Sequence, residues 1–267
     1  MPASPLPFDA AAAAGLAVSA AVALLLPFLL GHLWRRRSGA RWGSFGAGAL
    51  VFFVSQVVLR FPWQIPLGKY MVAHYSGKEP AWSLFILSAA LTAGIFEELG
   101  RYVGYRTLLK REQTPRAAVM FGLGHGGIEA ILIVGLSLAG LLIAWALASV
   151  GRLPAGPALE AIRAQVTGLT FAKGLLAGVE RISAMAVQVG LSLIVLQAFA
   201  RRRFRWVLLA IGLHFVVDAV AVLLLKRIGA YQTEILIGAM GAATLSFGWW
   251  LSRSPENRSI TSPAPAA

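Results

Sequence analysis

The sequence predicts an all-α, polytopic membrane protein with about seven transmembrane helices and one further interfacial or re-entrant helix. Of its 267 residues, 58% are hydrophobic and only 13% are charged, whereas soluble domains carry about 25% charged residues. Hydrophobic runs recur along the whole sequence and are separated by clusters of Arg and Lys. We therefore expect an integral membrane protein of a bacterial plasma membrane, with the lipid bilayer as its surroundings.

The net charge of +13 would suggest nucleic-acid binding in a soluble protein. Here the basic residues flank hydrophobic runs, so they are better explained as topology signals, and we expect no nucleic-acid partner. The sequence has no cysteine, which excludes disulfides, cysteine nucleophiles and thiolate metal sites.

The predicted spans follow from the hydrophobic runs, and they lie at residues 9–33, 42–61, 81–103, 117–150, 179–200, 206–225 and 229–251. The fourth run exceeds the ~20 residues that one straight crossing needs. Its four glycines between residues 122 and 127 are expected to bend the helix or to permit close helix packing.

The connecting segments are less regular. Residues 62–80 are expected to form a polar loop, and the mixed composition of residues 151–178 indicates an interfacial or re-entrant helix. We expect one transmembrane domain over residues 1–252 and a disordered tail over residues 253–267. Arg60, near the end of the second span, is expected to snorkel to the interface.

The distribution of Lys and Arg predicts the orientation. With the N-terminus outside, 14 basic residues fall on the cytoplasmic side and 7 on the other. This bias places the C-terminus in the cytoplasm.

Charged residues inside the third span are the strongest functional signal. Glu97, Glu98 and Arg101 interrupt an otherwise apolar run, and a charge at the centre of a bilayer costs roughly 2.5–3.5 kcal/mol even on lenient scales. Two adjacent glutamates therefore need partners in a polar interior. A purely structural ion pair is the simpler alternative, but one arginine cannot neutralise both carboxylates.

Two histidines occur at the same predicted depth as the glutamates. Glu97, His125 and His214 each lie nine residues from the basic residue that marks the cytoplasmic end of their span, which corresponds to ~13 Å along a helix. Three helices would thus bring a glutamate pair and two histidines to one level of the membrane.

Helical spacing supplies each of these groups with a neighbour. Arg101 follows Glu98 by three residues and Glu97 by four, so it can pair with either carboxylate on the same helix. The other two pairs, His125 with Glu129 and His214 with Asp218, have i,i+4 spacing. A carboxylate one turn away can orient each imidazole. The set suits activation of a water molecule, with a glutamate as base and histidines that stabilise an oxyanion.

Three segments resemble the motifs of the YhfC-type membrane peptidases, relatives of the CAAX-processing and bacteriocin-processing (CPBP) glutamate intramembrane proteases. The segments are FEELGR at residues 96–101, FGLGHGGIE at 121–129 and HFVVD at 214–218. They compare with EExxxR, FxxxH and HxxxN/D in the CPBP pattern, except that Arg101 follows Glu98 after two residues rather than three. The segments VSQVVLR at 54–60 and GVER at 178–181 also resemble the YhfC branch.

The resemblance implies an intramembrane endopeptidase that hydrolyses a membrane protein or a lipidated peptide. It implies that Glu97 or Glu98 activates the water, that His125 positions it, and that His214 with Asp218 forms the oxyanion site. Arg101 and Glu129 would be supporting residues. On this interpretation the enzyme requires no cofactor.

The same residues are also compatible with other functions. A zinc ion held by His125, His214 and Glu98 would also fit a catalytic pattern of three N/O ligands plus water. The same Glu, His and Asp set could instead serve as a proton relay in a proton-coupled transporter. A non-catalytic membrane scaffold is a third possibility.

Overall fold

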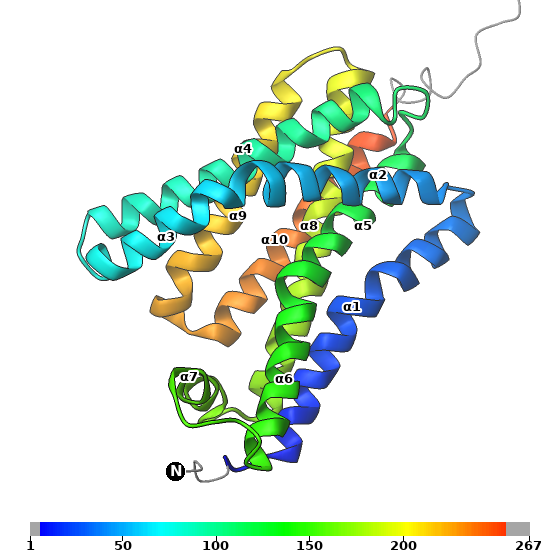
Figure 1. Cartoon of the computed structure of the whole chain (residues 1–267). Coiled ribbons are helices and arrows are strands. Elements are labelled where there is room, and N and C mark those ends of the chain that lie inside the picture. Colours follow the sequence, from blue (N-terminus) through cyan, green and yellow to red (C-terminus); the bar gives the residue numbers. More distant parts are fainter. Residues whose placement is uncertain (1–5, 255–267) are drawn as a thin grey trace, which may run out of the picture. The chain divides into compact units, whose positions relative to one another are not determined.

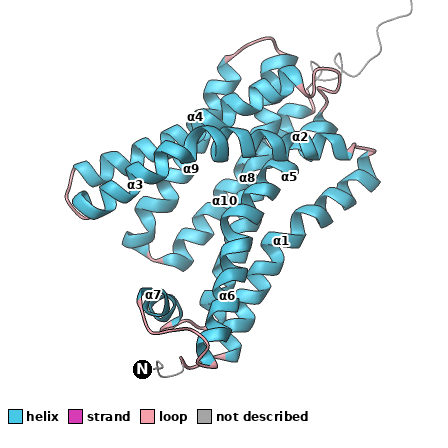
Figure 2. Cartoon of the chain, viewed as in Figure 1, coloured by secondary structure: helices cyan, strands magenta, loops and turns pink. Residues whose placement is uncertain are grey.

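All regular elements that the computed structural model describes, within residues 6–254, are helical (Figure 2). In chain order they are α1 (Ala10–Ser38), α2 (Trp42–Phe52), η1 (Phe53–Arg60), α3 (Phe61–Tyr75), α4 (Ala81–Thr107), α5 (Pro115–Glu129), η2 (Ala130–Gly135), α6 (Leu136–Ser149), α7 (Pro157–Val166), α8 (Phe171–Ala200), α9 (Arg205–Ile228) and α10 (Ala230–Ser252). The elements η1 and η2 are π-helical.

Seven of the described helical runs are long and apolar enough to cross a membrane. Two of them combine several elements without a break, because α2, η1 and α3 form one run, Trp42–Tyr75, and α5, η2 and α6 form another, Pro115–Ser149. The predicted all-α fold with about seven spans is therefore confirmed. The short α7 is the additional helix expected within residues 151–178.

Three details differ from the prediction. Residues 62–75 are helical and not a loop, with Pro62 at the start of α3, a position where proline is tolerated, and Pro66 inside the helix. The fifth span begins at Phe171 instead of 179. The long fourth run is one helical run of 35 residues, Pro115–Ser149, and it contains the π-helical turn η2 after its four glycines. The predicted tail, residues 253–267, lies almost entirely outside the described residues.

Contacts divide the chain into two units. The first contains the part of α1 up to Leu26 and residues Ala130–Ile182. Its buried apolar side chains come from Leu6, α1, α6 and α7 and include Trp145. In this unit α1 approaches α8 closely, since Ser19 Oγ donates to the Gly174 carbonyl at 2.6 Å and accepts from the Gly178 N–H at 2.9 Å.

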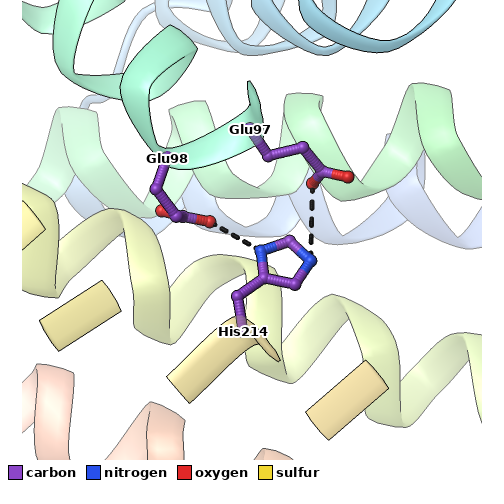
Figure 3. Close-up of side chains that lie close together, drawn as sticks. All are labelled: Glu97, Glu98 and His214. Atoms are coloured by element: carbon purple, nitrogen blue, oxygen red, sulfur yellow. Dashed lines mark hydrogen bonds and ion pairs between the residues drawn. The ribbon is translucent and has the colours of Figure 1, made fainter. Parts of the chain in front are cut away.

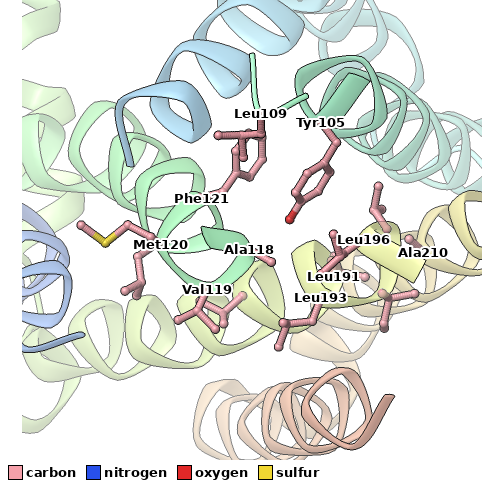
Figure 4. Packing of buried hydrophobic residues seen from close by; sticks show 14 of the residues in the cluster. Tyr105, Leu109, Ala118, Val119, Met120, Phe121, Leu191, Leu193, Leu196 and Ala210 are labelled. Carbon is pink, nitrogen blue, oxygen red and sulfur yellow. The ribbon is translucent and has the colours of Figure 1, made fainter. Parts of the chain in front are cut away.

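The second unit comprises Pro27–Glu129 and the chain from Ser183 onward. Its α2–η1–α3 run lies along α4, which also packs against α9 (Figure 1). The apolar core gathers where α4, α5 and α8 meet (Figure 4). There the ring of Tyr105 stacks on Phe121, and its hydroxyl donates to the Ser192 carbonyl at 2.9 Å.

Glycines set the spacing between α2 and α5. A Cβ on Gly124 would lie 1.9 Å from the Phe45 carbonyl oxygen, and one on Gly48 would lie 2.0 Å from the Phe121 carbonyl oxygen. Both distances are far below a van der Waals contact, so the two backbones can approach this closely only with glycine at these positions. On another side of α5, Gly122 and Gly126 allow the same approach to Gln188 and its neighbours on α8. The glycines thus serve close packing, one of the two roles expected from the sequence.

Candidate active site

Helix α4 presents Glu98 and Arg101 to the interior of the second unit as a buried ion pair. Arg101 Nε lies 2.9 Å from Glu98 Oε2, and both side chains are fully buried. A second guanidinium nitrogen, Nη2, lies 3.3 Å from Glu98 Oε1. Consecutive helical residues are rotated by about 100°, so Glu97 leaves the helix in another direction and has no such ion pair with Arg101. The structure thereby distinguishes two carboxylates that the sequence left equivalent.

His214 on α9 lies between the two glutamates (Figure 3). Its Nδ1 is 2.8 Å from Glu98 Oε1, and its Nε2 is 3.8 Å from Glu97 Oε2. The ionised Glu98 can only accept hydrogen bonds, so Nδ1 carries the proton that it donates to this carboxylate. The Nε2 edge of the ring is consequently directed toward Glu97.

His125 on α5 also contacts Glu97. Its Nε2 lies 3.0 Å from Glu97 Oε2, and the residue is fully buried. The close packing at Gly124 brings the α5 backbone, and with it His125, near α2 and α4. The other ring nitrogen, Nδ1, is buried and has no hydrogen-bond partner among the described residues. The structure therefore unites the predicted Glu97, Glu98, His125 and His214 in one cluster.

Asp218 forms the open edge of this cluster. Its Oδ2 lies 3.7 Å from His214 Nε2, and its side chain is 37% exposed, compared with 7% for Glu97 and none for Glu98. Glu129, half-buried, accepts a hydrogen bond from Gln188 Nε2 at 2.8 Å. Among Glu97, Glu98 and Asp218, the Asp218 carboxylate is therefore the one most accessible from outside the cluster.

Several polar residues that were not predicted from the sequence complete the site. Gln56 and Gln188 each donate to Glu97, and Ser192 accepts from Arg101 Nη1 at 2.5 Å. Gln56 lies in a segment that already resembled the YhfC branch, and Gln188 and Ser192 are isolated polar residues in the apolar α8. A search for single amides and hydroxyls inside predicted spans would have found all three. Arg60 also differs from expectation, because it is only 9% exposed and turns inward to Gln56.

The donor set is suitable for a divalent metal ion. Glu97, Glu98 and His214 are all buried, and each offers one ligand atom within 4.8 Å of the others. Three N/O ligands with an open position are typical of catalytic zinc. The zinc set expected from the sequence had His125 where this cluster has Glu97, and His125 here contacts Glu97 instead.

An apolar hollow of about 460 Å³ lies elsewhere on α4, between that helix, α2 and η1. Leu50, Val54, Phe96, Leu99 and Val103 are among its lining residues. None of the titratable residues of the cluster lines it, and its size alone does not make it a reaction site. The cluster is the better candidate because only it contains groups that can activate water.

The chain is similar to known proteins over most of its length. A family model described as "YhfC intramembrane metalloprotease" matches residues 22–240. The chain is also 38% identical over 242 residues to "Uncharacterized membrane protein YhfC" of Bacillus subtilis (strain 168), an alignment that covers 88% of this chain and 93% of that protein. No solved structure matches the chain.

Proposed function

The chain belongs to the YhfC family, whose model is described as "YhfC intramembrane metalloprotease", and we propose that it is an intramembrane endopeptidase in which Glu97 activates the attacking water. The proposal depends above all on one observation: Glu98 is paired with Arg101 at 2.9 Å, whereas Glu97 faces two histidines. A carboxylate in a bidentate pair with a buried arginine is committed to that pair. Glu97 is therefore the glutamate available to take a proton.

The neighbouring residues then have distinct roles. His125 holds Glu97 Oε2 at 3.0 Å and so fixes the direction from which the carboxylate meets a water molecule. Glu98 orients His214 through Nδ1, which directs Nε2 toward the reacting atoms. His214 and Asp218, at the open edge, face the substrate carbonyl, and His214, protonated on both ring nitrogens, would donate from Nε2 to the developing oxyanion.

A divalent ion fits this site as well. Glu97, Glu98 and His214 would hold it, and the ion would supply Lewis-acid polarisation and a bound water of lowered pKa. In that case Glu97 would be a metal ligand, and His125, whose Nε2 lies 3.0 Å from Glu97 Oε2, would be the outer-shell partner that orients it.

The substrate would be a membrane protein or a lipidated peptide, because the cluster lies within the predicted spans of α4, α5 and α9. The i,i+4 and interhelical contacts would also permit a proton relay, but nothing in the described structure favours transport over hydrolysis.

The test is cleavage of a membrane-peptide library by the purified protein, followed by mass spectrometry, with and without a chelator. Cleavage that persists in chelator supports direct activation by Glu97, and cleavage that stops and returns with zinc supports the metal-assisted form. A folded wild-type protein that cleaves nothing in a broad library contradicts the proposal.

A further inference from the structure

Two glutamines contact the two oxygens of Glu97, one each. Gln56 on η1 donates from Nε2 to Oε1 at 2.7 Å, and Gln188 on α8 donates from Nε2 to Oε2 at 3.1 Å. Both glutamines are buried, with 1% and 4% exposure. Glu97 therefore receives an amide hydrogen bond from each of two helices other than its own.

Each glutamine is in turn held by an arginine. Arg60 Nη1 donates to Gln56 Oε1 at 2.9 Å, and Arg101 Nη2 donates to Gln188 Oε1 at 2.5 Å. A guanidinium can only donate, so it can bind only the oxygen end of an amide. The arginine thus determines that the NH₂ end of each glutamine points at Glu97.

The remaining contacts of Arg60 make this arrangement specific. Its Nη2 donates to the Ala89 carbonyl at 2.7 Å, and its Nε lies 3.4 Å from Thr92 Oγ1, both on α4. Arg60 and Gln56 lie at the two ends of the same turn of the π-helix η1, and π-helical turns frequently occur at functional sites. A buried arginine so fixed cannot rotate away from the amide without losing these bonds.

We propose that the pairs Arg60–Gln56 and Arg101–Gln188 are positioning devices that fix the carboxylate plane of Glu97 toward His125 and His214. Neither glutamine is proposed to react. The importance of this positioning rests on the proposed role of Glu97, but the arrangement itself can be tested without substrate.

The chain provides a matched control. Gln197 also lies on α8, is fully buried, and accepts from Arg201 Nε at 3.2 Å, but its Nε2 donates to the Leu193 carbonyl, not to Glu97. It is a second arginine–glutamine pair, and Gln197 lies nine residues beyond Gln188 along α8, which corresponds to ~13 Å. Its loss should affect packing without affecting Glu97.

The experiment is isotope-edited infrared spectroscopy of metal-free protein at fixed pH, in which the Glu97 carboxylate stretch is assigned from its loss in Glu97→Gln. We expect Gln56→Met and Gln188→Met to shift this band, since each removes one donor, and Gln197→Met to leave it unchanged. Arg60→Met should shift the band as Gln56→Met does, because the Gln56 amide is then no longer held. Arg60→Lys should leave the band at its wild-type position, because a lysine ammonium group also only donates.

A band that is unchanged in both Gln56→Met and Gln188→Met, or that moves equally in Gln197→Met, overturns the proposal. If the methionine variants do not fold, solid-state NMR distances between labelled glutamine side-chain nitrogen and the Glu97 carboxyl carbon in wild-type protein decide the question. A shifted band in a protein that cleaves nothing would contradict the proposed function and leave the positioning intact. If the band is unchanged in the glutamine variants and Glu97→Gln is inactive, the positioning proposal is contradicted and the proposed function is supported.

Discussion

His125 Nε2 lies 3.0 Å from Glu97 Oε2, across the junction of α5 and α4. The two residues are far apart in sequence, and the contact depends on how closely α5 can pack. The glycines of α5 therefore determine the geometry of the site as well as the stability of the fold.

This dependence predicts the effect of Gly124→Ala. The added Cβ would lie 1.9 Å from the Phe45 carbonyl oxygen, so α2 and α5 must separate and His125 must move. Overpacking of this kind typically costs about 1–3 kcal/mol, and we expect a lower thermal midpoint in detergent together with reduced cleavage. Gly140→Ala on α6 is the control, because no atom lies within 4 Å of its added Cβ. Equal midpoints for the two variants would show that the close packing is unimportant.

Loss of Arg101 should destabilise the protein more than loss of an exposed arginine. In Arg101→Met the buried Glu98 keeps its hydrogen bond from His214 but loses its ion pair. Breaking a buried ion pair costs about 3–5 kcal/mol. Arg106→Met, on the exposed side of the same helix, should change the free energy of unfolding little. Chemical unfolding in mixed micelles measures the free energy of unfolding of both variants. An equal loss of stability in the two variants would contradict this expectation.

Metal binding should depend on His214. We expect cobalt titrations of chelator-treated protein to give d–d absorption bands, and His214→Ala to weaken binding at least about tenfold, the lower end of what even an outer-shell change costs. His74→Ala is the control, since His74 is exposed and bonded within its own helix. Identical titrations of wild type and His214→Ala would place any metal outside this cluster.

The open edge of the site can be mapped because the chain has no cysteine. Asp218→Cys should react readily with a water-soluble maleimide, because that side chain is 37% exposed. Ser192→Cys, at a fully buried position of the same site, should stay unmodified in the folded protein. Protection of the residue 218 cysteine, or equal labelling of both, would mean that water and substrate reach Glu97 by another route. Labelling from one side of sealed vesicles would also test the predicted orientation.

The sequence predicts most of the fold because hydrophobic runs and basic flanks are local signals. It also predicts which charged residues meet, since Glu97, His125 and His214 share one depth. It could not assign Glu97 and Glu98 different roles, because their partners depend on helix rotation. Gln56 and Gln188 were missed since an amide in an apolar span carries no charge signal, and Arg60 was expected at the interface because its inward partners come from α4.

Cleavage rates of Glu97→Gln and Glu98→Gln in folded protein decide whether Glu97 is the water-activating residue. Removal of a general base typically costs 10²–10⁴-fold in rate, about 3–5 kcal/mol. We expect a loss of this order for Glu97→Gln with the thermal midpoint retained. For Glu98→Gln we expect a lowered thermal midpoint, because Arg101 loses its charged partner. Cleavage by Glu97→Gln at the wild-type rate would contradict the role of Glu97 as the water-activating residue.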